Sequence, residues 1–253
     1  MKILGSDFDG TLNFGGFEES KYEAIRAWRA AGNRFGLVSG RGPSYLNHLR
    51  EEYPRLEMDF FVAYNGAFIV DAEGTPLDTT LCETVPAAEL TEALLDWGCP
   101  EVFVNGEGHY TVRRDGDTVA EGECTLSELP RDPSCFHQIS VCLDSVDEAA
   151  AVTRKLLDTY GDRLNPLQNG RCIDIVASSV HKAYGLRRLA ACLGYAETDI
   201  LTVGDNLNDL DMLKAFPSYA MENGVEEVKR AAGRTVQSVT DLIRQELALQ
   251  GKA

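Results

Sequence analysis

Positive charge is scarce in this chain, and the scarcity excludes one class of partner. Its 253 residues carry 24 Lys and Arg against 40 Asp and Glu, which gives a formal net charge of −16. Proteins that bind the nucleic-acid backbone present basic surface, so we expect no nucleic-acid partner. No apolar run reaches the ~20 residues of a membrane-spanning helix, so we expect no membrane partner either.

Cysteine and histidine are absent from the spacings that metal sites use. The seven cysteines contain no Cys-x-x-Cys, and the four histidines stand at no ligand spacing from one another or from the cysteines. A zinc site is therefore disfavoured. Because the number of cysteines is odd and no secretory signal precedes the first apolar run, we expect reduced thiols and a cytoplasmic protein.

The first third of the chain alternates apolar runs with segments of helical spacing. We expect strands at 3–5, 34–38 and 59–64, and helices at 19–31 and 43–51 between them. This β-α-β-α-β order is typical of a doubly wound parallel sheet.

The middle of the chain has a different pattern. It predicts a hairpin at 67–78, helices at 87–97 and 146–160, and short strands at 101–105, 109–113, 136–143 and 171–176. After Lys182 the α/β alternation returns, with helices at 182–193, 225–232 and 239–249 and strands at 200–203, 219–221 and 235–236. The expected fold class is α/β: a Rossmann-like doubly wound parallel-sheet core, residues 1–78 and 180–253, with an inserted α+β domain at 79–179.

Two acids stand at the end of the first expected strand. Asp7 and Asp9, in Asp7-Phe8-Asp9-Gly10-Thr11, follow the apolar run Ile3-Leu4-Gly5. Ligands of open α/β sheets bind at the carboxyl ends of the strands. Two carboxylates there can hold a divalent cation, attack an electrophile and move a proton. The alternative is structural, because Asp-Gly is also a common turn and such acids often cap the next helix.

A second acidic cluster follows the strand expected at 200–203. It reads Gly204-Asp205-Asn206-Leu207-Asn208-Asp209, and Asp205 faces Asp7 if the two strands are parallel neighbours. An oxygen-only ligand set of this kind suits magnesium, which also takes the phosphate oxygens of a substrate. The alternative is an acidic loop in which Asn208 or Asp209 caps a helix.

Two further elements could bind a phosphoryl group. Ser39-Gly40 ends another expected strand, where the hydroxyl and the following amides can accept a phosphate. Lys182 opens a helix and could balance a carboxylate and a phosphoryl group. The alternatives are a helix cap at Ser39 and a solvated surface lysine at Lys182.

In this order the four elements resemble the motifs of the haloacid dehalogenase (HAD) superfamily. The first is Asp7-x-Asp9-x-Thr11, the second Ser39, the third Lys182 and the fourth Gly204-Asp205-x-x-Asn208-Asp209. The insert between the second and third resembles the type II, subclass B cap of the Cof-like sugar-phosphatase group. Asn65-Gly66-Ala67 and Met221-Glu222-Asn223-Gly224 also resemble that group, and the resemblance covers nearly the whole chain.

The resemblance implies a role for each motif residue. Asp7 is implied as the nucleophile that forms an aspartyl-phosphate, and Asp9 as the acid and base that moves the proton. Asp7, the backbone carbonyl of Asp9 and Asp205 are implied as Mg²⁺ ligands, and Asp209 as a further ligand or as a residue that orients them. The residues implied to hold the transferring phosphoryl group are Thr11, Ser39, Gly40, Lys182 and Asn208.

The implied function is a magnesium-dependent phosphatase of small phosphorylated metabolites, with sugar phosphates as the leading substrate class. We expect a monomer or small homo-oligomer. The cap would contact the leaving group, with His109, Arg113, Asn169 and Arg171 as candidates. Two alternatives stay open: a phosphomutase of the same subclass, in which a sugar hydroxyl replaces water, and a phospho-accepting regulatory module, which would need neither Asp9 nor the large insert.

Overall fold

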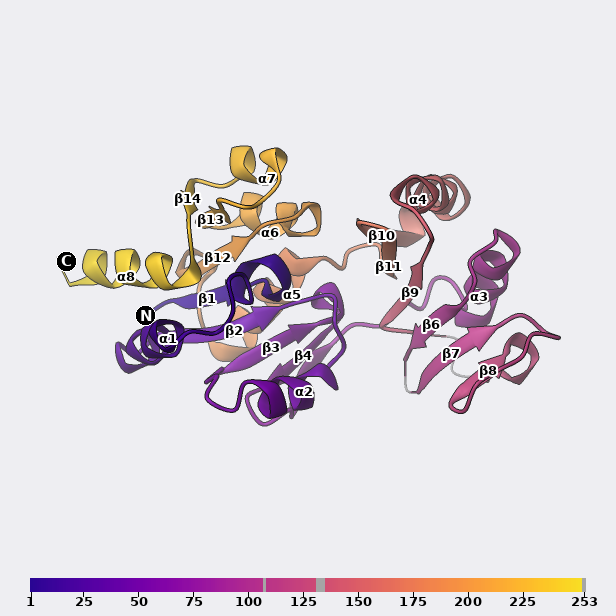
Figure 1. Cartoon of the computed structure of the whole chain (residues 1–253), viewed down its shortest axis with the longest axis horizontal. Helices are drawn as coiled ribbons and strands as arrows, with labels where there is room; N and C mark the ends of the chain where they lie inside the picture. Colours follow the sequence, from indigo (N-terminus) through magenta and orange to yellow (C-terminus); the bar gives the residue numbers. More distant parts are fainter. Residues whose placement is uncertain (107, 131–134, 252–253) are drawn as a thin grey trace. The chain divides into compact units, whose positions relative to one another are not determined.

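The computed structural model describes residues 1–106, 108–130 and 135–251. The chain divides into two compact units, Met1–Asp78 with His181–Ala253, and Thr79–Val180. The first unit is built from both ends of the chain, and the second is one continuous segment between them (Figure 1). No helix in these described ranges has the length and apolarity needed to cross a membrane.

The first unit contains an eight-stranded sheet in the order β14-β13-β12-β1-β2-β3-β4-β5. Its strands are β1 (Ile3–Ser6), β2 (Arg34–Val38), β3 (Phe60–Ala63), β4 (Phe68–Asp71), β5 (Pro76–Thr79), β12 (Ile200–Gly204), β13 (Ser218–Met221) and β14 (Arg234–Val236). Neighbours from β14 through β3 run parallel, and β4 runs antiparallel to β3. The predicted parallel-sheet core is confirmed. The two strands at 67–78 form as expected, and they extend this sheet beyond β3.

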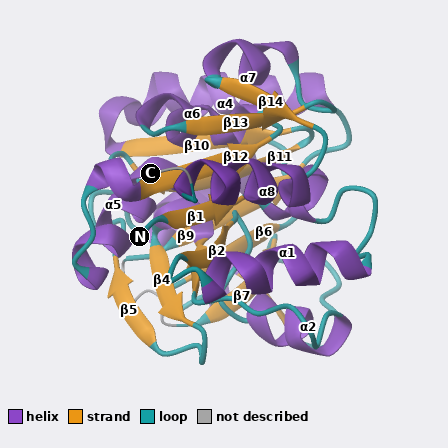
Figure 2. Ribbon diagram, turned by 90° about the vertical axis from the view of Figure 1, so that its left-hand side faces the viewer, coloured by secondary structure: helices purple, strands orange, loops and turns teal. Residues whose placement is uncertain are grey.

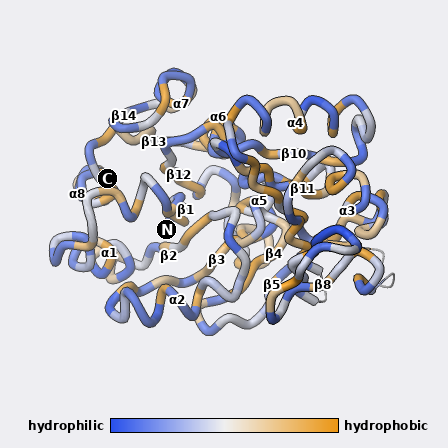
Figure 3. The backbone as a smooth tube through the Cα atoms, turned by 45° about the vertical axis from the view of Figure 1, so that its right-hand side comes forward, coloured by the Kyte–Doolittle hydropathy of each residue, from blue (hydrophilic) through white to orange (hydrophobic). Residues whose placement is uncertain are grey.

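Helices cover both faces of this sheet. They are α1 (Glu19–Ala30), α2 (Tyr45–Glu52), α5 (Lys182–Leu193), α6 (Leu210–Ala215), α7 (Glu226–Ala231) and α8 (Val239–Gln250). Successive strand residues point to opposite faces, so Leu4 packs in one cluster with Trp28 of α1 and Ile3 packs in another with Leu186 of α5. Figure 2 shows α1 and α8 in front of the sheet, and Figure 3 shows the apolar runs of its strands. Burial on both faces explains why the central strands β1, β2, β3 and β12 are mostly apolar.

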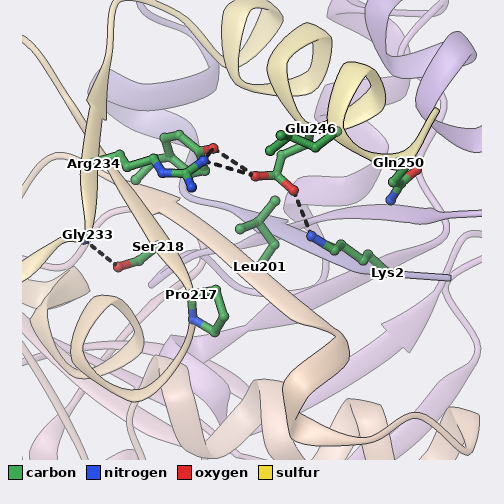
Figure 4. A pocket seen from close by; sticks show the side chains of 10 residues that line it. Lys2, Leu201, Pro217, Ser218, Gly233, Arg234, Glu246 and Gln250 are labelled. Carbon is green, nitrogen blue, oxygen red and sulfur yellow. Dashed lines mark hydrogen bonds and ion pairs between the residues drawn. The ribbon is translucent and has the colours of Figure 1, made fainter. Parts of the chain in front are cut away.

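An ion-pair network anchors α8 to the edge of the sheet where β1 and β14 begin (Figure 4). Glu246 of α8 is only 4% exposed. Its carboxylate accepts hydrogen bonds from Lys2 Nζ and Tyr219 Oη, both at 2.7 Å, and Arg234 donates to the same Tyr219 oxygen at 2.7 Å. Burial alone would raise the pKa of Glu246, but the bonds from Lys2 and Tyr219 outweigh it and lower the pKa. This network of ionised groups therefore connects α8 to the start of β1 and to β13 and β14.

The second unit contains a six-stranded sheet in the order β10-β11-β9-β6-β7-β8. Its elements are α3 (Ala87–Asp96), β6 (Val102–Asn105), β7 (His109–Arg113), β8 (Glu123–Thr125), β9 (Gln138–Cys142), α4 (Val146–Tyr160), β10 (Leu164–Asn169) and β11 (Cys172–Ala177). The α+β class expected for the insert is confirmed. The sequence did not predict β8, which is short, or β10, which contains Pro166. Proline lacks the N–H of a ladder, and β10 tolerates it because it is an edge strand.

The expectation of reduced thiols is wrong for two of the seven cysteines. Cys142 of β9 and Cys172 of β11 are direct partners in the antiparallel register and form a disulfide. Directly opposite residues of such a pair bring their Cβ atoms to about 4.5–5.5 Å, so the two thiols meet with little rearrangement. Spacing along the chain carries no information on register, which is why the pairing could not be predicted. The other five cysteines are free.

Candidate active site

Asp7 follows β1 directly and opens a tight turn, Asp7–Leu12. Its amide donates to the Val203 carbonyl of β12 at 3.0 Å, and the Leu12 amide donates back to the Asp7 carbonyl at 3.2 Å. Gly10 has φ +81°, and a Cβ there would lie 2.4 Å from Asp205 Oδ2. The turn therefore needs glycine at this position, because any side chain would push it away from Asp205.

Lys182, at the start of α5, is completely buried. Its ammonium donates to Asp7 Oδ1 and to Asp209 Oδ1, both at 2.6 Å. Burial alone would lower the pKa of Lys182, but the carboxylates of Asp209 and Asp7 outweigh it and raise the pKa. Lys182 is thus a charged group between two acids, which excludes the alternative of a solvated surface lysine.

Three carboxylates meet beside this ammonium. One oxygen from each of Asp7, Asp205 and Asp209 lies within 4.8 Å of the others. Burial raises the pKa of Asp7 to about 8 against the opposing effect of Lys182, and Asp209 and Asp205 add to the rise. Burial also raises the pKa of Asp205, although Thr11 Oγ1 donates to Asp205 Oδ1 at 2.6 Å. Once the Asp7 proton has left, three carboxylates against one ammonium leave two negative charges, and an oxygen-only set with that charge fits a hard divalent cation.

Asp209 also organises the loop that carries Asp205. Its second oxygen, Oδ2, accepts from the backbone amides of Asp205 at 2.9 Å and Asn206 at 3.1 Å. Asn208 is half-buried in the short 3₁₀ turn Leu207–Asp209. Asp209 is fully buried, so it fixes both the loop and the Lys182 ammonium.

Ser39 lies at the end of β2 and is buried. Its amide donates to the Val62 carbonyl at 2.9 Å, and its Oγ accepts from the Arg41 amide at 3.2 Å. Asp9 does not join the three-carboxylate cluster through its side chain. Instead its exposed carboxylate accepts from Arg41 Nε at 2.9 Å.

A left-handed turn connects the Ser39 loop with the start of α5. Tyr64 and Asn65 have φ +48° and +54°, and the Asn65 amide donates to the Ser39 carbonyl at 2.9 Å. A Cβ on Gly66 would lie 2.5 Å from the carbonyl oxygen of His181, the residue before Lys182. Positive φ in two consecutive non-glycine residues is costly and is found at sites where position matters.

Two residues that touch the motifs had no role in the sequence interpretation. Arg41 binds Asp9, and Asn223 Nδ2 donates to the Gly10 carbonyl at 2.9 Å. Two features of the sequence could have drawn attention to them. Arg41 stands two residues after Ser39, and Asn223 lies in a segment that resembles the Cof-like group. Neither signal indicates a partner, because each contact joins residues far apart in the chain.

The four residues suggested for leaving-group contact all lie in the second unit. Arg113 is engaged there, since its guanidinium donates to Glu101 and Glu123 at 2.7 Å each. His109 starts β7, Asn169 ends β10, and Arg171 is exposed just before β11.

A comparison with protein families gives the same result as the motif order. The model of the haloacid dehalogenase-like hydrolases matches residues 4–242. The chain belongs to this family. It is thus a hydrolase of the HAD type, as the sequence resemblance predicted.

Relatives and solved structures extend this finding. The Escherichia coli protein YbjI, a 5-amino-6-(5-phospho-D-ribitylamino)uracil phosphatase, is 28% identical over 92% of this chain and 89% of its own length. A haloacid dehalogenase-like hydrolase from Bacillus subtilis has the same fold, with a TM-score of 0.81 at 18% identity over 96% of this chain and 99% of its own. The HAD subclass IIB sugar phosphatase BT4131 has a TM-score of 0.78 at 19% identity, over 97% and 99% of the two chains. The named enzymes among these are phosphatases.

Proposed function

We propose that this HAD-family hydrolase is a magnesium-dependent phosphatase of small phosphorylated metabolites, with sugar phosphates as the leading class. The observation that carries the proposal is the buried Lys182 ammonium, which joins Asp7 to Asp209 beside Asp205. Phosphoryl transfer needs few covalent partners and much positioned charge, which this cluster supplies. The phosphatase functions of YbjI and BT4131 support the substrate class.

In the proposed reaction Asp7 is the nucleophile and Asp9 moves the proton. An Asp7 oxygen attacks phosphorus, the bond from phosphorus to the leaving oxygen breaks, and Asp9 gives that oxygen its proton. Water then attacks the phosphorus of the aspartyl-phosphate and gives a proton to Asp9, the bond from phosphorus to the Asp7 oxygen breaks, and inorganic phosphate leaves with the Asp7 carboxylate restored. Arg41, 2.9 Å from Asp9 Oδ2, orients the Asp9 carboxylate.

The acids at the edge of the sheet would hold the cation. We assign Asp7, Asp205 and the backbone carbonyl of Asp9 as the ligands of Mg²⁺. Asp209 would orient them, since both of its oxygens already accept hydrogen bonds. Bound there, Mg²⁺ would supply positive charge that offsets the repulsion between the Asp7 carboxylate and the phosphoryl oxygens.

The remaining motif residues would hold the phosphoryl group. Lys182 places its positive charge against Asp7, and Ser39 is held in place by the left-handed turn at Asn65. Donors fixed in this way stabilise developing negative charge without having to reorganise. The full proposed set is Thr11, Ser39, Gly40, Lys182 and Asn208.

A phosphate-release screen over phosphorylated metabolites tests the proposal. With Mg²⁺ we expect release of inorganic phosphate, and with EDTA a loss of about 100-fold or more that added Mg²⁺ restores. Interconversion of hexose 1- and 6-phosphates without net release would favour a phosphomutase instead. Phosphorylation by acetyl phosphate with negligible turnover would favour a regulatory phospho-acceptor.

Stabilisation by Mg²⁺ should depend on pH. The pKa of Asp7 in the metal-free fold is raised from 3.8 to about 8, so its proton must leave before the carboxylate can bind a cation. Without metal, stability linked to Asp7 is fully present below about pH 4 and is lost as pH rises towards 8. We therefore expect the Tm increase at a fixed Mg²⁺ concentration to grow from about pH 6 to about pH 8. Differential scanning fluorimetry measures it, and an increase that is constant with pH would contradict the expectation.

A further inference from the structure

Lys21, near the start of α1, is buried among backbone carbonyls. Its side chain is only 6% exposed. Its ammonium donates to the carbonyl oxygens of Leu12 at 2.5 Å, Phe14 at 3.2 Å and Gly16 at 2.6 Å. The same nitrogen lies 4.8 Å from the centre of the Phe17 ring. All three hydrogen-bond donors of the lysine are thus used on one short loop, residues 12–16.

Burying the Lys21 ammonium in this way costs free energy, because a buried charge is removed from water. Buried ammonium groups are normally paired with a carboxylate, as Lys182 is. Within the described part of the chain, Lys21 forms no ion pair, and burial lowers its pKa while Glu18 only partly opposes that effect. A loop could satisfy its carbonyls with water at less cost. The buried cation therefore indicates that this loop must be held in one conformation.

The loop continues directly from the Asp7–Leu12 turn. The backbone of Leu12 is held on both sides, because its amide donates to the Asp7 carbonyl and its carbonyl accepts from Lys21. The Phe14 amide donates to the Thr11 carbonyl at 3.3 Å. One residue, Leu12, and the two hydrogen bonds that it makes therefore connect the Lys21 ammonium to the backbone of Asp7.

We propose that Lys21 is a positioning residue for the reaction at Asp7. Through the carbonyls of residues 12–16 it holds the Asp7–Leu12 turn, and with it the Asp9 and Thr11 side chains, in the geometry that phosphoryl transfer needs. The proposal rests on the proposed phosphatase function. Lys21 itself touches neither the three-carboxylate cluster nor Ser39, and its contribution is to the geometry of the turn.

The test compares Lys21→Met with Lys2→Met in p-nitrophenyl phosphate turnover with Mg²⁺. Both changes remove a lysine from the first unit, and Lys2→Met breaks the Glu246 ion pair at the start of β1, away from Asp7. Both variants should lower Tm. Because displacement of reacting groups by about 1 Å can cost 100-fold, we expect kcat to fall about 10- to 100-fold in Lys21→Met alone, with KM within about twofold. Lys21→Gln, which keeps an N–H donor, should fall in between.

Amide hydrogen exchange provides a readout that does not need activity. We expect faster exchange over residues 8–17 in Lys21→Met and unchanged exchange there in Lys2→Met. Unchanged kcat in Lys21→Met at a temperature where it is folded, or unchanged exchange in this segment, would overturn the proposal. A wild-type protein without phosphatase turnover would instead refute the proposed function, and the exchange result would still decide whether Lys21 holds the turn.

Discussion

Replacing Asp7 by Asn is expected to lower the rate of Mg²⁺-supported hydrolysis of p-nitrophenyl phosphate by at least about 10³-fold. An amide is a poor nucleophile, and it removes one of the three carboxylates near the proposed cation. The fold should survive, because burial already favours a neutral side chain at this position and raises the pKa of Asp7. The Asn oxygen can still accept from Lys182. We therefore expect a Tm equal to or above that of the wild type in metal-free buffer.

Phosphate release and thermal melts measured on the same preparation separate these effects. A matched control is Asp147→Asn, which makes the same chemical change on the exposed first turn of α4. Retention of wild-type turnover by Asp7→Asn would remove Asp7 as the nucleophile. A loss of turnover together with a collapse in Tm would instead show that the carboxylate is needed for folding.

Lys182→Met is expected to be the most destabilising single change at the site. It leaves the buried carboxylates of Asp7 and Asp209 without the ammonium that both contact at 2.6 Å. Breaking a buried ion pair from one side costs about 3–5 kcal/mol. Activity should fall by about 10³-fold or more, since the phosphoryl group and Asp7 both lose a fixed positive charge.

Urea denaturation at several pH values measures the stability loss. Lys182 opposes the rise that burial causes in the pKa of Asp7, so without Lys182 the Asp7 carboxyl should hold its proton more tightly in the folded state and the variant should regain stability as pH falls. Lys182→Met combined with Asp209→Asn should recover part of the stability but none of the activity, because one unpaired charge is removed while the nucleophile remains unsupported. Wild-type stability in the single variant would contradict the buried ion-pair network as the structure has it.

Much of the fold could be predicted because its strands are buried on both faces. Runs such as Arg34–Val38 and Ile200–Gly204 are apolar almost throughout, which distinguishes them from the amphipathic helices around them. The second unit was harder, because most of its strands pair antiparallel and alternate buried with partly exposed residues, as β6 and β9 do. Pro166 argued against a strand at β10, because proline is compatible with a strand only at the edge of a sheet. Whether a strand lies at an edge depends on the tertiary structure and could not be known from the sequence.

Some residues of the candidate site could be placed from the sequence, and others could not. Asp7 and Asp205 could be placed together because the carboxyl ends of neighbouring parallel strands meet at one edge, and the β1–β12 register bears this geometry out. The burial of Lys182, the pairing of Arg41 with Asp9 and the three carbonyls around Lys21 could not be derived. Each depends on loops whose paths are set by contacts between distant residues. The Cys142–Cys172 disulfide could not be predicted either, because it also depends on a contact between distant residues.

The first unit is built from two separate segments of the chain, so the candidate site can form only late in synthesis. β1 lies between β2 and β12 in the sheet, so during synthesis one side of β1 has no partner until about residue 200 has been made. Asp7 is made before the second unit, while Lys182, Asp205 and Asp209 are made only after the whole of it. Closing such a long loop is slow and leaves an open strand edge in the meantime. A nascent chain that stops before β12 would therefore carry Asp7 without the Asp205 and Asp209 carboxylates that cluster with it, and it would be prone to aggregate along β1.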